Sequence, residues 1–273
     1  MRDTGKGQRV ADDIEASTGR AVHVAELHLD DVASVHAFVE AWSGPLHILI
    51  LDAGIMDTPL ACTSADWESQ LATNHLGHLA LAVGLHDALV AAGSARAVSV
   101  SSSGHGGSSF HFEDPFFLRR AYEPGLAYGQ SKTANALFAV EAQRRWGAEG
   151  ITANALMPGR IWTGPQKHWD PAVVAELTVQ AADQMKTTEQ GASTSVLLAT
   201  APEHEGYGER CFEDNREARV VPEIYGAVHG VLPRGARPRG RLPAVGRLDR
   251  AGRRRGRTAG PGRVGALRSP VPR

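Results

Sequence analysis

The sequence has little cysteine and no long apolar run. Cys62 and Cys211 are the only cysteines among 273 residues, so we expect neither a disulfide framework nor a cysteine-based metal site. No stretch reaches the roughly 18 apolar residues that a membrane-spanning helix needs, and the N-terminus has no charged-then-apolar signal pattern. We therefore expect a soluble protein in a reducing, cytoplasmic setting, with no membrane partner.

Lysine, the aromatic residues, isoleucine and methionine are missing from the last part of the chain. Residues 226–273 contain thirteen Arg and one Asp but no Lys or Glu, a net charge of +12, so residues 1–225 carry sixteen basic and twenty-nine acidic side chains, a net charge of -13. The segment also lacks Phe, Trp, Tyr, Ile and Met, and it cannot bury enough apolar surface to offset the entropy lost on ordering. We predict a folded domain over 1–225 and a disordered tail over 226–273.

Two interpretations of this tail compete. An arginine-rich arm would bind nucleic acid or another polyanion. Alternatively, the tail is a GC-rich gene translated in a shifted reading frame, which yields Arg, Gly, Pro and Ala. The absence of lysine beside thirteen arginines favours the second interpretation and argues against a nucleic-acid partner.

Strand-like and helix-like segments alternate through the first 160 residues. Helical patterns occupy 6–18, 30–42, 64–93 and 127–147, and strand patterns occupy 21–27, 46–54, 95–103 and 150–159. The helix at 64–93 is expected to begin at a Ser64 N-cap, and the continuous apolar run "LHILILDAG" predicts a strand buried on both faces. This alternation predicts an α/β fold with a doubly wound, mostly parallel sheet and right-handed crossovers.

Several residues with chemical potential lie where the predicted strands end. Asp52-Ala53-Gly54, Ser101-Ser102-Ser103 and Pro158-Gly159 each close a strand, and Tyr128 and Lys132 lie near the start of the helix at 127–147. Ligands of doubly wound sheets bind beyond the carboxyl ends of the strands. We therefore expect these residues to meet at one rim of the sheet.

Five ordered motifs carry a resemblance to a known family. "LDAGIM", "NHLGH", "VSSSGH", "YGQSK" and "PGRIWT" follow one another as they do in the short-chain dehydrogenase/reductase family, and "FEDP" and "SKTANALF" resemble its retinol-dehydrogenase-like branch. The resemblance covers about residues 1 to 220. It implies a Rossmann-type sheet, NADP(H) or NAD(H) as cofactor, and hydride transfer between nicotinamide and a small alcohol or carbonyl substrate.

The resemblance assigns four catalytic residues. Tyr128 would exchange a proton with the substrate oxygen, since the ammonium of Lys132 one turn away and the positive nicotinamide both favour phenolate. Lys132 would also hold the nicotinamide ribose, and Ser102 would hydrogen-bond the substrate oxygen, with Ser101 and Ser103 as rivals. Asn74 matches the residue that anchors a water in the proton relay; the alternative is an asparagine bonded only to backbone.

The resemblance also assigns cofactor contacts. Arg2 falls where NADP-preferring members place an arginine, which favours NADP over NAD, although a solvated terminal residue is an equal alternative. Asp52 replaces the family's asparagine, and His28 replaces the aspartate that meets the adenine, so both changes should weaken cofactor binding. Together with Tyr128 and Lys132, the predicted cofactor-binding residues are Arg2, Asp52, Ala53, Gly54, Pro158, Gly159, Ile161 and Thr163.

The resemblance is incomplete at both ends of the chain, because the family's first elements are missing at the N-terminal end and the similarity stops near residue 220. The family's first strand and its glycine-rich turn have no counterpart here, so we expect a Rossmann-type sheet that lacks its first strands. A second hypothesis is therefore a catalytically silent scaffold that binds a partner through its sheet edges or tail, and a second copy is a candidate partner. His75 and His78 share a helix face without a third ligand, so no metal site is predicted.

Overall fold

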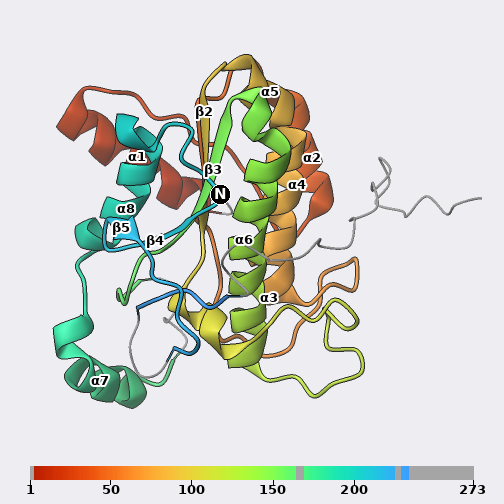
Figure 1. The fold of residues 1–273 in the computed structure, drawn as a ribbon, viewed down its shortest axis with the longest axis vertical. Helices are drawn as coiled ribbons and strands as arrows, with labels where there is room; N and C mark the ends of the chain where they lie inside the picture. The colour runs from red at the N-terminus through yellow and green to blue at the C-terminus, as the bar shows by residue number, and fades with distance from the viewer. Residues whose placement is uncertain (1–2, 164–168, 225–228, 234–273) are drawn as a thin grey trace, which may run out of the picture. The chain divides into compact units, whose positions relative to one another are not determined.

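Four parallel strands form the centre of the protein, and a short antiparallel strand continues one edge (Figure 1). This computed structural model describes residues 3–163, 169–224 and 229–233, and its sheet has the strand order β1-β2-β3-β4-β5. The parallel pairs join β1 to β2, β2 to β3 and β3 to β4. The strands are β1 Ile48–Leu51, β2 Ala95–Val100, β3 Ile151–Met157, β4 Cys211–Glu213 and β5 Arg216–Glu217.

Helices cover both faces of this sheet. Figure 1 shows α6 and α4 on one side of the strands, with α2 packed against α4, and α8 on the other side. This arrangement confirms the predicted doubly wound, Rossmann-type fold. The α-helices are α1 Thr4–Thr18, α2 Val32–Ala41, α3 Ser69–Leu71, α4 Gly77–Gly84, α5 His86–Ala91, α6 Pro124–Trp146, α7 Pro171–Gln180 and α8 Thr188–Thr200. Shorter helical turns are π-helical at Ala72–Leu76 and 3₁₀ at Ser103–Gly107, Gly147–Glu149, Ala182–Gln184 and Pro202–His204.

The two central strands are buried on both faces. Every residue of β2 and of β3 is buried. On the α8 side, Val98, Leu156 and Leu198 form one apolar cluster, and on the α6 side Ala136 and Met157 belong to another. Small alanines facing α6 let that helix lie close to the sheet, and this closeness places the residues of α6 beside the strand ends.

Side-chain caps fix where the principal helices begin. The Asp31 carboxylate accepts from the amide of Ala33 at the start of α2, and the Glu123 carboxylate accepts from the first-turn amides of α6. Pro124 follows as the first residue of α6, a position that suits proline because no helical partner for its nitrogen is lost. Thr187 and Gln190 form a reciprocal capping box at the start of α8.

The helix predicted over 64–93 differs in its start and its continuity. Its first helical residue is Ser69, because the carboxylate of Glu68, and not the hydroxyl of Ser64, accepts from the amides of Gln70 and Leu71. Ala72–Leu76 then form a π-helical turn, and a further break separates α4 from α5. The prediction of one long helix was therefore wrong in detail, although helical structure occupies most of 69–91.

The strand predicted at 21–27 does not form. An extended segment becomes a strand only when its backbone groups pair with a neighbour, and within the described part of the chain no strand pairs with the outer edge of β1. The same edge position explains why β1 is buried on one face and not on two. Leu49 and Leu51 are buried, whereas Ile48 and Ile50 are 41% and 42% exposed.

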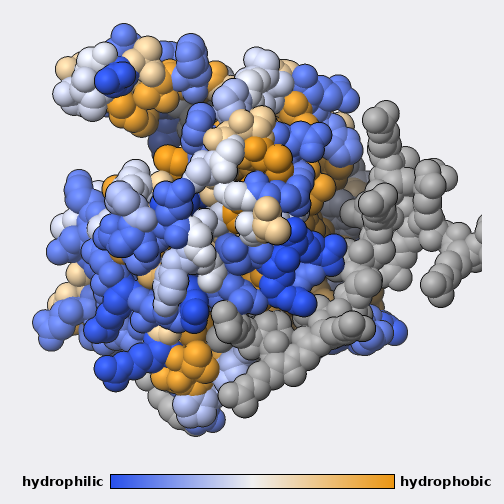
Figure 2. Space-filling view, turned by 45° about the horizontal axis from the view of Figure 1, so that its top comes forward, coloured by the Kyte–Doolittle hydropathy of each residue, from blue (hydrophilic) through white to orange (hydrophobic). Residues whose placement is uncertain are grey.

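Two terminal segments contribute unequally to the folded part. Helix α1 buries only Gly7 and Ala11, and its Val10 and Ile14 remain exposed. Figure 2 shows apolar surface among the polar surface of this face of the molecule. Residues 229–233, which the sequence placed in the tail, pack against the folded domain, with Val231 2% exposed. The domain boundary at 225/226 stays a prediction, and the predicted tail from 234 onward lies outside the described residues.

Candidate active site

Tyr128 and Lys132 lie on consecutive turns of α6 and face the same rim. The ammonium nitrogen of Lys132 is 5.7 Å from the centroid of the Tyr128 ring. This geometry follows from their four-residue spacing on a helix whose start is fixed by Glu123 and Pro124.

The loop after β2 brings a serine to the tyrosine. Ser102 caps the 3₁₀ turn Ser103–Gly107, where its Oγ accepts from the Gly104 amide at 3.1 Å, and its side chain also hydrogen-bonds Tyr128. Contact this close requires glycines: a Cβ on Gly104 would lie 2.7 Å from Tyr128 Cε1, and one on Gly129 would lie 2.7 Å from the Gly104 carbonyl oxygen. The predicted pair of Ser102 and Tyr128 is therefore brought together.

The neighbouring serine has a different partner. Ser101 is 2% exposed, and its hydroxyl donates to the Lys132 carbonyl oxygen at 2.7 Å. This bond fastens α6 to the end of β2. Of the two serines, Ser102 is the one whose hydroxyl faces the tyrosine.

Lys132 is held inside the protein. Its Nζ donates to the Val100 carbonyl oxygen at 3.0 Å, and the residue is 5% exposed. Burial lowers the pKa of Lys132 to about 8, and the negative charge of Asp52 opposes part of this decrease. Asp52 therefore has a favourable effect that the sequence comparison with asparagine did not anticipate, because it helps to keep the lysine charged.

The pKa of Tyr128 does not move in the expected direction. Burial raises it, and the hydrogen bond from Ser102 offsets only part of the increase. We expected the ammonium of Lys132 to favour the phenolate, but the loss of hydration around the phenol is the largest effect on this pKa. The phenol of Tyr128 is therefore protonated at neutral pH.

Asn74 lies inside the π-helical turn and is fully buried. Its amide pairs with both backbone groups of Ile55 and donates to Ser131 Oγ at 2.9 Å. The backbone carbonyl oxygen of Asn74 accepts a hydrogen bond from His78 Nδ1 at 2.9 Å. The side chain is thus committed to the loop after β1, and the backbone carbonyl is the group that faces a buried imidazole.

The predicted cofactor loops lie at the same ends of the strands. Asp52 and Ala53 are exposed after β1, and a Cβ on the next residue, Gly54, would lie 3.2 Å from Asn74 Oδ1. Gly159 has a φ of +94°, which favours glycine, and a Cβ there would lie 2.8 Å from Lys186 Nζ.

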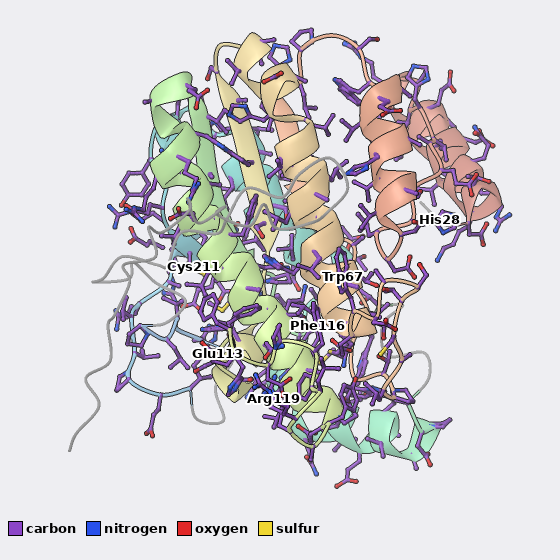
Figure 3. All side chains as sticks on the ribbon, turned by 90° about the vertical axis from the view of Figure 1, so that its right-hand side faces the viewer. His28, Trp67, Glu113, Phe116, Arg119 and Cys211 are labelled. Atoms are coloured by element: carbon purple, nitrogen blue, oxygen red, sulfur yellow. The ribbon has the colours of Figure 1, made fainter. Side chains whose placement is uncertain are left out.

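The other residues predicted to contact the cofactor lie around and after Gly159, or in other parts of the chain. Pro158 and Ile161 are half-buried, Ile161 packs against Gly191 of α8, and Thr163 is exposed. Arg2 lies outside the described residues. His28 hydrogen-bonds Glu26 at 2.9 Å. Figure 3 shows His28 on the opposite side of the view from Cys211, the first residue of β4.

The two histidines of the "NHLGH" motif are uncharged at neutral pH. Burial lowers the pKa of His75 to about 4 and, with the charge of Lys132 as a further cause, lowers that of His78 to about 4. His75 bonds Asn135 and His78 bonds the Asn74 carbonyl. Among the described residues, no group of three or more His, Cys, Asp or Glu side chains could hold a metal ion.

Comparison with known families identifies the family of this chain. The family model described as short chain dehydrogenase matches residues 1–173. This chain belongs to the short-chain dehydrogenase family. Relatives within the family include two proteins that place it in the retinol-dehydrogenase-like branch, Retinol dehydrogenase 12 of Homo sapiens and Polyprenol dehydrogenase of Mus musculus. They are 35% and 37% identical over 81% and 80% of this chain, which correspond to 70% and 68% of their own lengths.

A bacterial relative is more similar, and solved structures share the fold. "Probable oxidoreductase" of Streptomyces lividans is 55% identical over 76% of this chain and 72% of its own length. An uncharacterized protein from Mycobacterium paratuberculosis is 39% identical with a TM-score of 0.52, over 68% of this chain and 65% of its own. A protein from Beutenbergia cavernae, described as a "putative NAD(P) dependent gluconate 5-dehydrogenase" and solved with NADP bound at low occupancy, is 25% identical with a TM-score of 0.59, over 76% of this chain and 79% of its own.

Two groups of site residues in this dehydrogenase fold were missed from the sequence. Lys186 donates to the Pro158 carbonyl oxygen at 3.1 Å and pairs with Asp214, so it braces the Pro158–Gly159 loop from 27 positions beyond Gly159. No local pattern marks this lysine. Its position emerges only when α8 is folded against β3.

The second group joins the loops on either side of the site. The Gln70 amide donates to the Tyr122 hydroxyl and to the Pro124 carbonyl oxygen, and the Tyr122 hydroxyl donates to the Glu68 carboxylate. Burial raises the pKa of Glu68, and it raises the pKa of Tyr122 to about 12. Figure 3 shows Trp67 near Phe116, and their rings stack with their centroids 6.4 Å apart.

Within the described ranges, no helix is long and apolar enough to cross a bilayer.

Proposed function

We propose that this protein is an NADP(H)-dependent oxidoreductase that interconverts a small alcohol and its carbonyl compound. The observation that carries the proposal is the meeting of Ser102, Tyr128 and Lys132 at one rim, with the serine hydroxyl bonded to the phenol and the ammonium 5.7 Å from its ring. Three side chains from two elements form this arrangement, and the family's reaction requires a proton donor, an oxygen-binding hydroxyl and a nearby cation.

The residues present fit the nicotinamide end of such a cofactor. Lys132 offers an ammonium, an added Cβ would lie 3.2 Å from its nearest neighbour at Gly54 and 2.8 Å at Gly159, and Pro158 precedes Gly159. Lys132, Gly159, Ile161 and Thr163 would hold the cofactor, with Arg2 as the candidate contact for a 2'-phosphate. When bound, the nicotinamide supplies the hydride for carbonyl reduction or accepts it in alcohol oxidation.

The chain's own groups supply the proton chemistry. In reduction, the Tyr128 hydroxyl donates its proton to the substrate oxygen, and the raised pKa of Tyr128 keeps that proton available at neutral pH. Ser102 Oγ hydrogen-bonds the same oxygen as negative charge develops there. The ammonium of Lys132 stabilises the phenolate that remains, and Asp52 favours the charged state of this lysine.

The preference for NADP(H) over NAD(H) is part of the proposal. It rests on the arginine at position 2 and is consistent with the NADP bound in the Beutenbergia cavernae relative. We also propose a cytoplasmic location and a small-molecule partner, in line with the sequence.

A second candidate function is a catalytically silent protein that binds a partner at the edge of its sheet. The exposure of Ile48 and Ile50 on β1 favours it, since an edge strand with apolar side chains can pair with another chain. Such a protein would not bind nicotinamide cofactors.

Titration with NADPH and with NADH, followed by nicotinamide fluorescence, separates the two candidates. Binding with a dissociation constant of about 10 μM or tighter, stronger for NADPH, supports the oxidoreductase, and a panel of aldehydes and ketones then identifies substrates. Absence of binding to both nucleotides would contradict it.

A further inference from the structure

Residues 219–224 and 229–233, which we call the C-terminal strap, are joined to one another by hydrogen bonds. The Val221 amide donates to the Val231 carbonyl oxygen at 2.9 Å, and the Val231 amide donates to the Arg219 carbonyl oxygen at 2.8 Å. The Gly230 amide also donates to the buried carboxylate of Glu213 at the end of β4. These bonds give the strap a fixed place at the end of the sheet.

The strap packs against the two elements that carry the catalytic side chains. Val231 is 2% exposed and belongs to an apolar cluster with Ala136 and Ala139 of α6. On the loop that begins at Ser102, a Cβ on Gly106 would lie 3.2 Å from Ile224, so the strap lies directly on that loop. Both α6 and the serine loop therefore have the strap as a neighbour.

His105 connects the loop to the strap. Its side chain is 1% exposed, its Nδ1 lies 2.7 Å from the Ser102 carbonyl oxygen, and its Nε2 lies 3.0 Å from the Leu232 amide nitrogen. Because the Ser102 carbonyl can only accept and the Leu232 amide can only donate, Nδ1 must carry the proton and Nε2 must not. These two partners together require an uncharged imidazole in one tautomer.

We propose that His105 is a positioning residue for Ser102, and that it acts as an uncharged Nδ1–H imidazole clamped between the Ser102 carbonyl and the C-terminal strap. The clamp matters because Ser102 uses its other groups elsewhere: Oγ accepts from Gly104 and bonds Tyr128. Fixing the carbonyl of Ser102 fixes the direction from which its hydroxyl meets the substrate oxygen. The catalytic consequence rests on the proposed oxidoreductase function, whereas the clamp itself does not.

The clamp is tested without any turnover. In hydrogen exchange of the full chain, Leu232→Pro removes the donor to Nε2, and we expect the 102–107 amides to exchange at least about tenfold faster than in Leu232→Ala, which keeps the amide but loses the same packing. Equal exchange of the 102–107 amides in these two variants would overturn the proposal.

Imidazole nitrogen NMR supplies a second test of the same clamp. The signal that disappears in His105→Asn identifies His105, and we expect a protonated Nδ1 and an unprotonated Nε2 at pH 7. A charged imidazole or the Nε2–H tautomer at that pH would likewise overturn it.

Turnover tests the positioning role. His105→Asn keeps a donor near Nδ1, His105→Gln keeps an acceptor that can reach the Leu232 amide, and His105→Ala keeps neither. With NADPH and a carbonyl substrate of the wild type, we expect kcat to fall on the order of tenfold or more in the alanine variant, less in the other two, and KM for NADPH to change less than about threefold. Exposed His111 gives the control, since its bond to Gln130 comes from the backbone amide, which His111→Asn keeps, and this variant should match the wild type.

The outcomes separate this proposal from the proposed function. A wild type that reduces no carbonyl contradicts the oxidoreductase assignment, and the exchange and NMR results still decide whether the clamp exists. An active wild type with unchanged kcat in all three His105 variants overturns the positioning role alone.

Discussion

Asn74 and Ile55 are joined by two hydrogen bonds, as neighbouring strands are. The Ile55 amide donates to Asn74 Oδ1 at 2.8 Å, and Asn74 Nδ2 donates to the Ile55 carbonyl oxygen at 2.9 Å. A side chain on a helix thereby satisfies the backbone of the loop that leaves β1. The π-helical turn turns this asparagine toward the loop, and the pair fixes the start of the predicted cofactor rim.

Replacing this asparagine should lower stability. Asn74→Ala removes three hydrogen bonds and leaves the Ile55 amide and carbonyl without these partners, so we expect the free energy of unfolding to fall by about 2 to 3 kcal/mol. Urea unfolding followed by circular dichroism measures the change. Gln184→Ala, at an exposed amide, is the control, and equal midpoints for the two variants would contradict the prediction.

Loss of the Tyr128 hydroxyl should separate binding from turnover. Tyr128→Phe removes the proton donor but leaves the ring and Lys132 in place, so we expect carbonyl reduction to fall roughly 100- to 10,000-fold while NADPH binding changes little. Steady-state kinetics and fluorescence titration give the two quantities. In Tyr207→Phe the lost hydroxyl bonds Glu217, away from the rim, and activity should persist; comparable losses in both variants would argue against the assigned role.

The buried lysine should make stability depend on pH. The folded protein releases the Lys132 proton near pH 8, whereas the unfolded chain keeps it up to about 10.5, so between these values the unfolded state binds more protons. The free energy of unfolding of the wild type relative to Lys132→Met should therefore rise as the pH increases from 8 to 9.5, by on the order of 1 to 2 kcal/mol.

Urea unfolding at several pH values gives this difference. The window stays below the range in which Tyr128, whose raised pKa acts in the opposite direction, would interfere. Lys6→Met provides a comparison at an exposed position, and a flat difference between wild type and Lys132→Met would show that the lysine is not perturbed as described.

The turn after β3 should not accept a side chain. Gly159→Ala combines a φ of +94° with a Cβ only 2.8 Å from Lys186, so we expect a loss of about 1 to 3 kcal/mol in stability, together with weaker NADPH binding. Gly93 has a φ of +72° and nothing within 4 Å of an added Cβ, so Gly93→Ala isolates the cost of the backbone conformation. Thermal unfolding should show the larger decrease for Gly159→Ala; the reverse order would contradict the role of Lys186.

Much of the rim could be predicted from the sequence because its signals are local. The four-residue spacing of Tyr128 and Lys132 lies in a helix with a clear cap at Glu123 and Pro124, and Ser102 ends a run of strand residues. Parallel strands put their carboxyl ends at one edge, so the meeting of these residues follows from topology. The β4–β5 turn also has a local signal that could have been used. Its residues Asp214 and Asn215 are of the types that tolerate the positive φ that tight hairpin turns require, and both adopt it.

Other features have no local signal. The π-helical turn at Ala72–Leu76 differs from an α-helix in that its backbone hydrogen bonds span five residues in place of four, which composition does not reveal. The segment at 21–27 has the right alternation, but a strand also needs a paired neighbour, and no described strand pairs with this segment. The direction of the Tyr128 pKa depends on how much water the folded protein removes from the phenol, which follows from packing and not from the spacing to Lys132.

The contact between His105 and Leu232 also sets an order in time. It joins residues 127 positions apart, so a chain growing from its N-terminus contains the catalytic serine, tyrosine and lysine before it contains the residue that completes their support. At about 5 to 20 residues per second, synthesis needs roughly 6 to 25 s to pass from one to the other. After Lys132 has been added and until Leu232 follows, the nascent chain carries the three proposed catalytic side chains around a loop that still lacks this hydrogen bond.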